Sequence, residues 1–276
     1  MKKVVITIPV YKKEPSNLEV LSFKQVLKVL KKYDIVVFTH ASLDLRVYYN
    51  LANEVGKNFM KVIFDEEYFK SIAGYNRLML SVDFYKCFSD YKYLLIYQLD
   101  AFVFRDELEY WCDKGYDYVG APFFKSLKDD IYGTKMLGVG NGGFSLRRID
   151  YCKKVLSLYR NKVLVSPLAY FYKDKFINAL IRIPWRLMGR KNTLQWFMDN
   201  VNEDFIFSWC ISNSSYSASL PSCDEALHFA FEVNPKYCYE LTNGILPFGC
   251  HAFAKYEYDS FWKPIILAEL GVVSGG

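Results

Sequence analysis

The chain has 276 residues, of which 52% are hydrophobic and 24% are charged. This is the composition of a globular protein with enough chain to bury a core, and we expect a single domain over residues 1–276. No apolar run is long enough for a transmembrane helix, and the first residues lack the apolar core of a signal peptide, so a cytoplasmic location is expected. The seven cysteines are scattered without a Cys-x-x-Cys pair, which indicates neither a disulfide framework nor a zinc site.

The net charge of +5 is distributed unevenly along the chain. Residues 153–192 contain ten Lys and Arg side chains and one acid, Asp174, so this basic segment carries +9 and the rest of the chain −4. A local basic segment indicates one anionic partner surface and argues against a general nucleic-acid-binding protein. We therefore expect no nucleic acid partner.

The first 120 residues alternate short apolar runs with longer stretches of helical periodicity. The predicted strands cover residues 3–10, 34–39, 59–64 and 91–104, and the predicted helices between them cover 17–32, 43–55 and 75–88. Ser16 or Asn17 is the expected N-cap of the first helix. This βαβαβαβ order predicts a mostly parallel sheet with helices on both faces. A short helix over 106–114 and a strand over 116–122 continue the series.

After Phe124 the regular alternation stops. Five glycines from Gly133 to Gly143 predict a loop that leads into a strand over 144–146. Beyond it we expect helices over 150–160, across the basic segment and over 193–211, then strands over 227–232 and 237–241, a loop over 246–253 and a closing helix.

Asp100 interrupts the run YKYLLIYQLDAFVF, which is otherwise almost wholly apolar and is expected to be a strand buried on both faces. An ionised carboxylate in such surroundings costs several kcal/mol unless it is paired or binds a metal or a ligand donor. Asp100 therefore indicates a site at the carboxyl end of this strand. The alternative is an Asp that only caps the following turn.

Four blocks that are far apart in the sequence suit one site. They are Ile8–Tyr11 after the first strand, Asp100, the acids of Asn202–Asp204, and the block FGCHAF around His251. The first block lies at the carboxyl end of a strand, where open α/β sheets receive ligands.

With these blocks in order, the sequence resembles the nucleotide-sugar-dependent glycosyltransferases of the GT-A fold. The likeness extends to a bacterial group of glycosyltransferase-like sequences in which QLDAFVF, GNGGFSLR, NEDFIF and LPFGCHAF recur in this order, and it covers residues 4–262. The resemblance implies an α/β fold with a Rossmann-like, mostly parallel sheet flanked by helices. Residues 1–124 would form the nucleotide-sugar-binding half, and residues 125–276 a helical, basic, acceptor-binding half.

The resemblance also implies a donor site for a nucleotide-sugar, with a UDP-sugar as the expected donor. The expected donor-binding residues are Pro9, Val10, Tyr11, Asn76, Arg77, Asp100, Ala101 and Lys255. The first three would surround the base or ribose, Asp100 the ribose or diphosphate, and Lys255 the phosphate.

The Asp-x-Asp triplet that holds a divalent metal in the GT-A family is incomplete here, because it reads Asp100-Ala101-Phe102. Mg²⁺ tolerates a single carboxylate when substrate phosphates and waters fill the other positions. The resemblance implies His251 as a second ligand, so Asp100, His251 and a diphosphate would hold Mn²⁺ or Mg²⁺. Two alternatives stay open: Lys or Arg neutralises the diphosphate without a metal, or His251 is a satisfied core residue.

Glu203 and Asp204 are adjacent acids on a predicted helix, where neighbours point about 100° apart, so only one can face a pocket. By resemblance to inverting enzymes, Asp204 is the expected catalytic base that takes the proton of the acceptor hydroxyl. Glu203 would be its catalytic neighbour and would bind acceptor hydroxyls. The alternative is a solvated helix face.

The glycine-rich segment 138–145 has neither the position of a dinucleotide fingerprint nor the spacing of a P-loop. The resemblance places Asn141, Gly142 and Gly143 between the donor sugar and the acceptor, where glycine lets the backbone approach a ligand closely. A plain tight turn is the alternative.

The basic segment 153–192 also carries apolar side chains at helical spacing, including Leu168, Phe171 and Trp185. This combination is typical of an interfacial helix that meets anionic lipid, although a helix packed on the core would share it. We expect peripheral contact with the inner face of the cytoplasmic membrane.

These features together predict an inverting glycosyltransferase that moves a sugar from a nucleotide donor to a lipid-linked glycan or a cell-surface polysaccharide. One alternative is a catalytically silent nucleotide or sugar binder, which the missing second acid of the triplet favours. Another is an α/β phosphate-ester hydrolase that uses Asp100, which is disfavoured because no second metal-binding cluster accompanies this residue.

Overall fold

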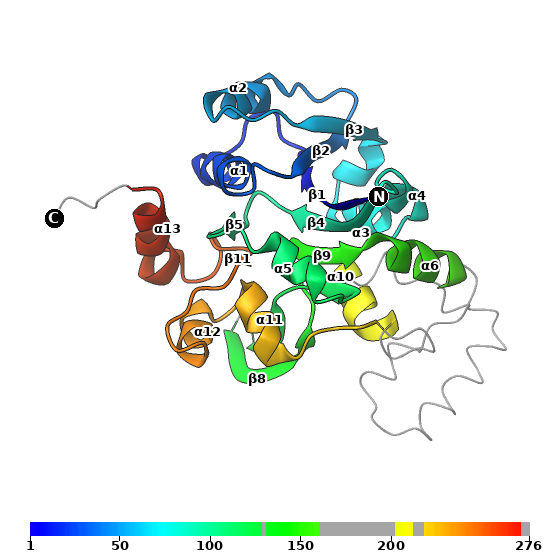
Figure 1. Cartoon of the computed structure of the whole chain (residues 1–276). Helices are drawn as coiled ribbons and strands as arrows, with labels where there is room; N and C mark the ends of the chain where they lie inside the picture. Colours follow the sequence, from blue (N-terminus) through cyan, green and yellow to red (C-terminus); the bar gives the residue numbers. More distant parts are fainter. Residues whose placement is uncertain (129–130, 160–201, 212–217, 272–276) are drawn as a thin grey trace.

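The computed structural model describes residues 1–128, 131–159, 202–211 and 218–271. The fold is mixed α/β, with a mostly parallel central sheet between helices, as the strand and helix pattern predicts (Figure 1). The six strands lie in the order β3 (Met60–Phe64), β2 (Asp34–His40), β1 (Lys2–Pro9), β4 (Tyr91–Tyr97), β9 (Phe144–Arg148) and β6 (Tyr118–Val119). The first four are parallel neighbours, whereas β9 runs antiparallel to both β4 and β6.

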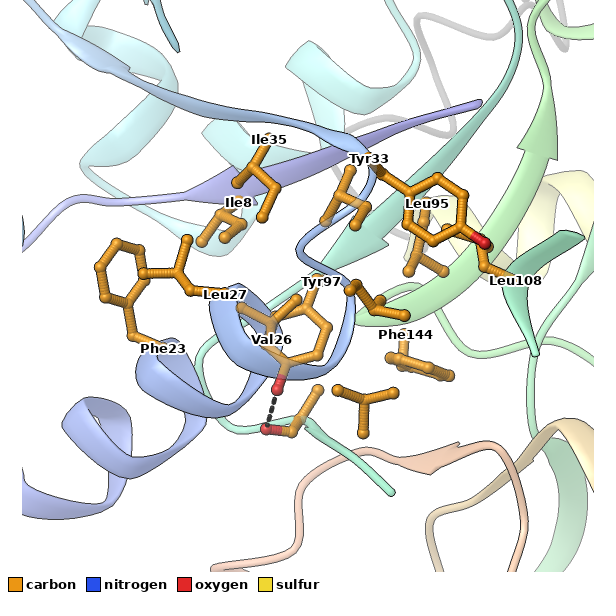
Figure 2. Close-up of a cluster of buried hydrophobic side chains, with 14 of the residues drawn as sticks. Ile8, Phe23, Val26, Leu27, Tyr33, Ile35, Leu95, Tyr97, Leu108 and Phe144 are labelled. Atoms are coloured by element: carbon orange, nitrogen blue, oxygen red, sulfur yellow. Dashed lines mark hydrogen bonds between the residues drawn. The ribbon is translucent and has the colours of Figure 1, made fainter. Parts of the chain in front are cut away.

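Both faces of this sheet are buried, which explains why its strands read as continuous apolar runs. Alternating side chains of β1 point to opposite faces, so Ile8 packs in one apolar cluster and Val5 in another. Figure 2 shows the first cluster, which gathers Phe23 and Leu27 of α1 with Ile8 and Tyr97 of the sheet. The helices on this face are α1 (Asn17–Val29), α2 (Arg46–Glu54) and α5 (Leu108–Asp113), and those on the other face are α3 (Ile72–Met79), α4 (Val82–Lys86) and α6 (Ile149–Tyr159).

Of the two expected N-caps of α1, Ser16 and Asn17, Ser16 takes this position. Its hydroxyl accepts a hydrogen bond from the backbone N–H of Glu19 at 3.3 Å, and the Glu19 carboxylate accepts one from the N–H of Ser16 at 2.7 Å. This reciprocal pair satisfies two backbone donors that the first turn would otherwise leave open.

Most of the remaining elements form a smaller layer beside the central sheet. A third apolar cluster, which includes Phe102, Phe231 and Trp262, holds this layer together. Its strands are β5 (Phe102–Val103), β11 (Gly249–Cys250) and β10 (Ala230–Phe231) in one small sheet, and the hairpin β7 (Pro122–Lys128) and β8 (Ile131–Val139). Its helices are α11 (Cys223–Phe229), α12 (Pro235–Leu241), η3 (Tyr258–Trp262) and α13 (Lys263–Glu269). The other three helical elements pack with the second cluster, on the central sheet; they are η1 (Glu66–Phe69), α10 (Glu203–Phe205) and η2 (Ile206–Ile211).

Two predicted elements of the first half are each divided in two. The helix expected over 75–88 is α3 followed by α4, because Ser81 starts a new helix by accepting a hydrogen bond from the N–H of Asp83 at 3.2 Å. The strand expected over 91–104 ends at Tyr97, and the chain turns before it enters β5 in the smaller sheet.

Three predictions for the second half are wrong. Gly133 and Gly138 lie in β8 and not in a loop, since the irregular register of the β7–β8 hairpin accepts glycine within a strand. The strand expected over 227–232 is mostly α11, which Ser222 caps, and only β10 remains of it. The strand expected over 237–241 is α12, which Pro235 opens from its first turn.

Some predictions fall outside the described residues. They include residues 193–201 of one predicted helix and residues 160–192 of the basic segment. The described part of the helix predicted over 193–211 consists of α10 and η2 and is helical as expected. None of the helices in the described ranges combines the length and the apolar character that crossing a membrane requires.

Candidate functional site

A cleft with a volume of about 770 Å³ lies where β1 and β4 end. After β1 the chain passes through β2 and β3 on one side before it returns to β4 on the other. The carboxyl ends of β1 and β4 therefore form the switch point at which open α/β sheets receive ligands. The cleft brings together most of the predicted site residues, namely Pro9, Val10, Tyr11, Asn76, Asp100, Asn141, Gly142, Gly143, Glu203, Asp204, His251 and Lys255.

Arg77 and Ala101 do not line the cleft, so their expected contact with the donor is not supported. Arg77 lies on the exposed side of α3, one residue after Asn76, which faces inward. Ala101 is fully buried under the turn after β4, where its N–H donates to the carbonyl of Gln98 at 2.9 Å.

Asp100 lies in this turn and not at the end of a strand. Its carbonyl accepts a hydrogen bond from the N–H of Phe253 at 3.2 Å, and its side chain is 46% exposed toward the cleft. Burial opposes ionisation of this carboxyl, but His251 outweighs burial and holds the pKa of Asp100 below 3.8. Asp100 therefore presents an anionic oxygen to the cleft.

His251 is held between two carboxylates. Its Nε2 lies 3.2 Å from Asp100 Oδ1, and its Nδ1 lies 3.1 Å from Glu232 Oε1. Burial lowers the pKa of His251, but the charges of Asp100 and Glu232 outweigh burial and raise this pKa well above 6.5. Strand β11 fixes the backbone just before His251. The N–H of His251 itself donates a hydrogen bond to the carbonyl of Phe231 at 2.9 Å.

Asp100 and His251 could share a divalent cation once His251 gives up the ring proton that its raised pKa indicates, because a metal-binding imidazole nitrogen must be unprotonated. Within the described ranges no group of three or more His, Cys, Asp and Glu side chains is placed to hold a metal. Asp100 Oδ1 and His251 Nε2 are nevertheless close enough to share one ion, and Gln98 Oε1 lies 3.2 Å from the same nitrogen. A cation such as Mg²⁺ accepts so few protein ligands when phosphates and waters complete its shell. The backbone of Gly143 lies directly against this ring, because a Cβ on residue 143 would lie 1.9 Å from Nε2.

The glycine loop between β8 and β9 has a backbone that few side chains would allow. Asn141 has a left-handed φ of 68°, and its side-chain oxygen accepts a hydrogen bond from the N–H of Gly143 at 3.1 Å. The carbonyl of Gly143 in turn accepts from the N–H of Gln98 at 2.8 Å. The loop is thus tied to the turn that carries Asp100, and its glycines bring the backbone close to both His251 and Glu203.

Glu203 forms a buried ion pair that the sequence does not reveal. Its Oε1 lies 2.8 Å from Nη2 of Arg147, and the two side chains are 3% and 0% exposed. The second oxygen, Oε2, is buried without a hydrogen-bond partner among the described residues. Glu203 is therefore not part of a solvated helix face.

Asp204 lies next to this pair and lines the cleft. Burial, with the neighbouring charge of Glu203 as the second cause, raises the pKa of Asp204 from 3.8 to about 7. One of its oxygens accepts a hydrogen bond from the N–H of Phe205 at 2.7 Å, which partly offsets this rise. A carboxyl with such a pKa can accept a proton near neutral pH, which is the property of a general base.

Several aromatic side chains also line the cleft. Tyr11 is 52% exposed, and Tyr68, Phe69 and Tyr75 belong to the same lining. Lys12 contributes a cation that is paired with Glu19 at 2.8 Å. Apolar rings with a few polar groups are typical of pockets for small organic ligands.

Several residues that line the cleft or contact its lining are absent from the sequence-based predictions. Arg147 stands in the block GNGGFSLR, but a buried partner for it could not be foreseen. Glu232 falls within a predicted strand, and only the fold brings it to His251. Lys12 directly follows the predicted block Ile8–Tyr11, and its position was the one available signal.

Comparison with known proteins gives a family and a set of distant structural likenesses. Residues 58–251 match the family described as "Protein of unknown function (DUF5672)", and no curated protein matches the sequence. One similar solved structure is core-mannan synthase A of Aspergillus fumigatus in a Mn/GDP form, with 11% identity and a TM-score of 0.42 over 57% of this chain and 63% of that one. Another is residues 1–349 of S. aureus TarS, with 12% identity and a TM-score of 0.35 over 55% and 49%. The chain spans less than two thirds of either protein, and likeness at this level does not bear on its activity.

Proposed function

Since the chain belongs to DUF5672, a family of unknown function, its activity must be inferred from its site, and we propose that it is a nucleotide-sugar-dependent glycosyltransferase. The observation that carries this proposal is the convergence of two kinds of acid on one cleft. Asp100, beside His251, suits a metal and a diphosphate, whereas Asp204 has the pKa of a base. A transferase needs both functions around a single sugar.

The donor is proposed to lie along the ends of β1 and β4. Pro9, Val10 and Tyr11 would contact the base or ribose, and Asn76, which lines the same cleft, would help to hold the nucleotide. A UDP-sugar is the proposed donor. The diphosphate would lie near Asp100 and Lys255, which line the cleft.

Asp100 and His251 are the proposed protein ligands of Mn²⁺ or Mg²⁺. When bound there, the ion would neutralise negative charge on the leaving diphosphate. Glu232 holds the other ring nitrogen of His251 at 3.1 Å and so fixes the orientation of the imidazole.

Asp204 is the proposed general base of an inverting transfer. An acceptor hydroxyl is a poor nucleophile until its proton is removed, and a carboxylate opposite the leaving phosphate can remove it as the hydroxyl attacks the anomeric carbon. The chemical balance is simple: the new glycosidic bond forms, the bond between sugar and phosphate breaks, and the proton stays on Asp204. Asn141, Gly142, Gly143 and Glu203 would border the acceptor.

The proposed acceptor is a lipid-linked glycan or a cell-surface polysaccharide at the inner face of the cytoplasmic membrane. The basic segment 153–192, most of which lies outside the described residues, would supply the contact with anionic lipid.

The first test is a thermal-shift screen against nucleotides and nucleotide sugars, with and without Mn²⁺. A ligand that binds only the native state raises the melting temperature. A donor that binds should then be consumed when glycan acceptors are added, with release of the nucleotide. Binding without turnover of any donor would favour the silent binder, and release of inorganic phosphate from simple esters would favour the hydrolase.

The second test is the Asp204→Asn variant, which keeps the shape of the side chain and removes its basicity. Loss of a positioned base typically slows a reaction about 10²- to 10⁴-fold. Donor binding should stay near that of the wild type. If the variant keeps transfer within about threefold, or if the product retains the anomeric configuration of the donor, the roles of base and of inversion are wrong.

A further inference from the structure

Arg147 is a cation inside the protein that no part of the proposed reaction has used. It lies on β9, the strand antiparallel to β4, and its side chain is fully buried. A buried guanidinium is tolerated only where hydrogen bonds and an opposite charge replace its water. Its partners therefore show what it holds in place.

Those partners come from both sides of the acceptor end of the cleft. Nη2 donates to Glu203 Oε1 at 2.8 Å and to the carbonyl of Gly142 at 3.2 Å, so one nitrogen joins α10 to the glycine loop. Nε donates to Ser145 at 3.0 Å and Nη1 to the hydroxyl of Tyr85 at 3.1 Å, which anchors the guanidinium in the sheet and in α4.

Two aromatic rings also pack against this guanidinium. Its central carbon lies 5.2 Å from the ring centre of Tyr118 and 5.5 Å from that of Phe207, and the two rings stack on each other with their centres 5.9 Å apart. The hydroxyl of Tyr118 also donates to the carbonyl of Asn141 at 2.6 Å. Tyr118 therefore connects the surroundings of the guanidinium to the glycine loop at a second point, Asn141, besides the bond from Arg147 to Gly142.

Within the described residues, the hydrogen bond of the Asp204 side chain is a local one. Its Oδ1 accepts from the N–H of the next residue, Phe205, at 2.7 Å, so its direction follows the start of α10. That start is held by Arg147 through Glu203 on one side. On the other side, Asn76 of α3 accepts from the N–H of Glu203 at 3.4 Å and donates to Asn202 at 3.3 Å.

We propose that Arg147 is a positioning residue, which aims the carboxylate of Asp204 at the cleft by joining Glu203 of α10 to Gly142 of the glycine loop. This inference rests on the proposed function for its catalytic consequence, but the coupling of Arg147 to Asp204 is a property of the chain itself. The sequence singled out the acids and the glycines separately, and Arg147 is the group that connects them.

The electrostatic part of the coupling has a defined sign. The charged or titratable groups that act on Asp204 are Glu203 on its own helix, Glu232 after β10 and Arg147 on β9, and the buried hydroxyl of Tyr118 on β6 also interacts with it. Of the two members of the pair, Glu203 raises the pKa of Asp204 more than Arg147 lowers it. Removing Arg147 alone should therefore raise this pKa as long as Glu203 stays ionised, and removing both charges should lower it.

The test is a titration of the Asp204 carboxyl by carbon NMR in the full chain, with the resonance assigned by its loss in Asp204→Asn. Arg147→Met should shift the midpoint to higher pH, and Arg147→Met with Glu203→Gln should shift it below that of the wild type. The double variant leaves no unpaired buried charge, so it keeps the test decisive if the single variant does not fold. Arg148→Met is the matched control, because Arg148 follows on the same strand and pairs with Asp117 away from the cleft.

Arg147→Lys keeps the charge but cannot reproduce the fork of hydrogen bonds. Its titration midpoint should stay at the wild-type value while the transfer rate falls by about tenfold or more, with the KM for the donor unchanged. An Asp204 midpoint that is equal in wild type and in both Met variants would overturn the proposal, as would a wild-type transfer rate in Arg147→Lys. A chain that transfers no sugar at all would refute the proposed function, and the titration would still decide whether Arg147 acts on Asp204.

Discussion

Replacing Asp204 by Asn should make the folded protein more stable at alkaline pH, and this result needs no knowledge of the substrate. Asp204 has a pKa of about 7 in the folded chain against 3.8 as its ordinary value. The folded state therefore holds a proton that the unfolded state releases. As the pH rises from about 4 to about 7, ionisation of Asp204 favours the unfolded state, and the protein loses stability over this window.

The size of the effect follows from the two pKa values. A difference of about 3 units corresponds to about 4 kcal/mol at about 1.36 kcal/mol per unit. Solvent reaches part of the Asp204 side chain, so we expect a smaller loss, about 2–4 kcal/mol at pH 8 relative to pH 4. The Asn side chain does not titrate, and the variant should escape this loss.

The measurement is the free energy of unfolding by urea at several values from pH 4 to pH 8, for wild type and Asp204→Asn. The difference between the two proteins should be small at pH 4, grow toward pH 7 and then level off. Asp90→Asn is the control, since it removes an exposed acid from the segment before β4. If the difference between wild type and Asp204→Asn does not change with pH, the pKa of Asp204 is not raised in the folded protein. Its role as base would then lose its physical support.

Four further outcomes are expected. Gly143→Ala would put a Cβ 1.9 Å from Nε2 of His251 and should abolish any stimulation of nucleotide binding by Mn²⁺. Gly133→Ala is the control, since its Cβ would lie no closer than 3.5 Å to another atom, and it should bind like the wild type. Equal binding by both variants would show that Gly143 is not part of the binding site. His251→Ala should lose the melting-temperature increase that Mn²⁺ adds to a nucleotide, and an increase that persists, together with activity that EDTA does not reduce, would argue against a metal held there. The transfer rate should rise with pH through about 7 as Asp204 loses its proton, and a rate that is flat between pH 5 and 8 would contradict its role. Vesicles with anionic lipid should bind the full chain through residues 153–192 and release it as salt is added, while equal binding to neutral vesicles would exclude the electrostatic explanation.

The central sheet could be predicted from the sequence because its strands are short, apolar and separated by helical periodicity. The same local signals failed where tertiary packing decides the structure. The strand expected at 237–241 is a helix, since Asn234 takes a left-handed φ of 50° and Pro235 then starts a helical turn. Aromatic residues in that stretch favour a strand locally, but Cys238, Tyr237 and Tyr239 pack as a helix against the third apolar cluster.

The sequence predicted most of the residues of the candidate site but not the contacts between them. Asp100, Asp204 and His251 stand out in the sequence because they are ionisable residues within apolar or aromatic stretches, which indicates a functional role. The partners of these residues depend on contacts between distant segments. Arg147 meets Glu203, and Glu232 meets His251, only because β9 and β11 lie where they do, and no local pattern encodes that.

The pairing of β5 with β11 has a consequence for the order in which the protein acquires its site. Phe102 and Cys250 are register partners about 150 residues apart in sequence. Closing the loop between them costs chain entropy, and the parallel strands of the central sheet can pair before this cost is incurred. Strands β1 to β4 need only residues 2–97 and can associate early, whereas His251 reaches Asp100 only after β11 has docked. Refolding experiments should therefore find the sheet protected from hydrogen exchange before the chain gains its affinity for nucleotide, with a delay that lengthens when the β5–β11 contact is weakened.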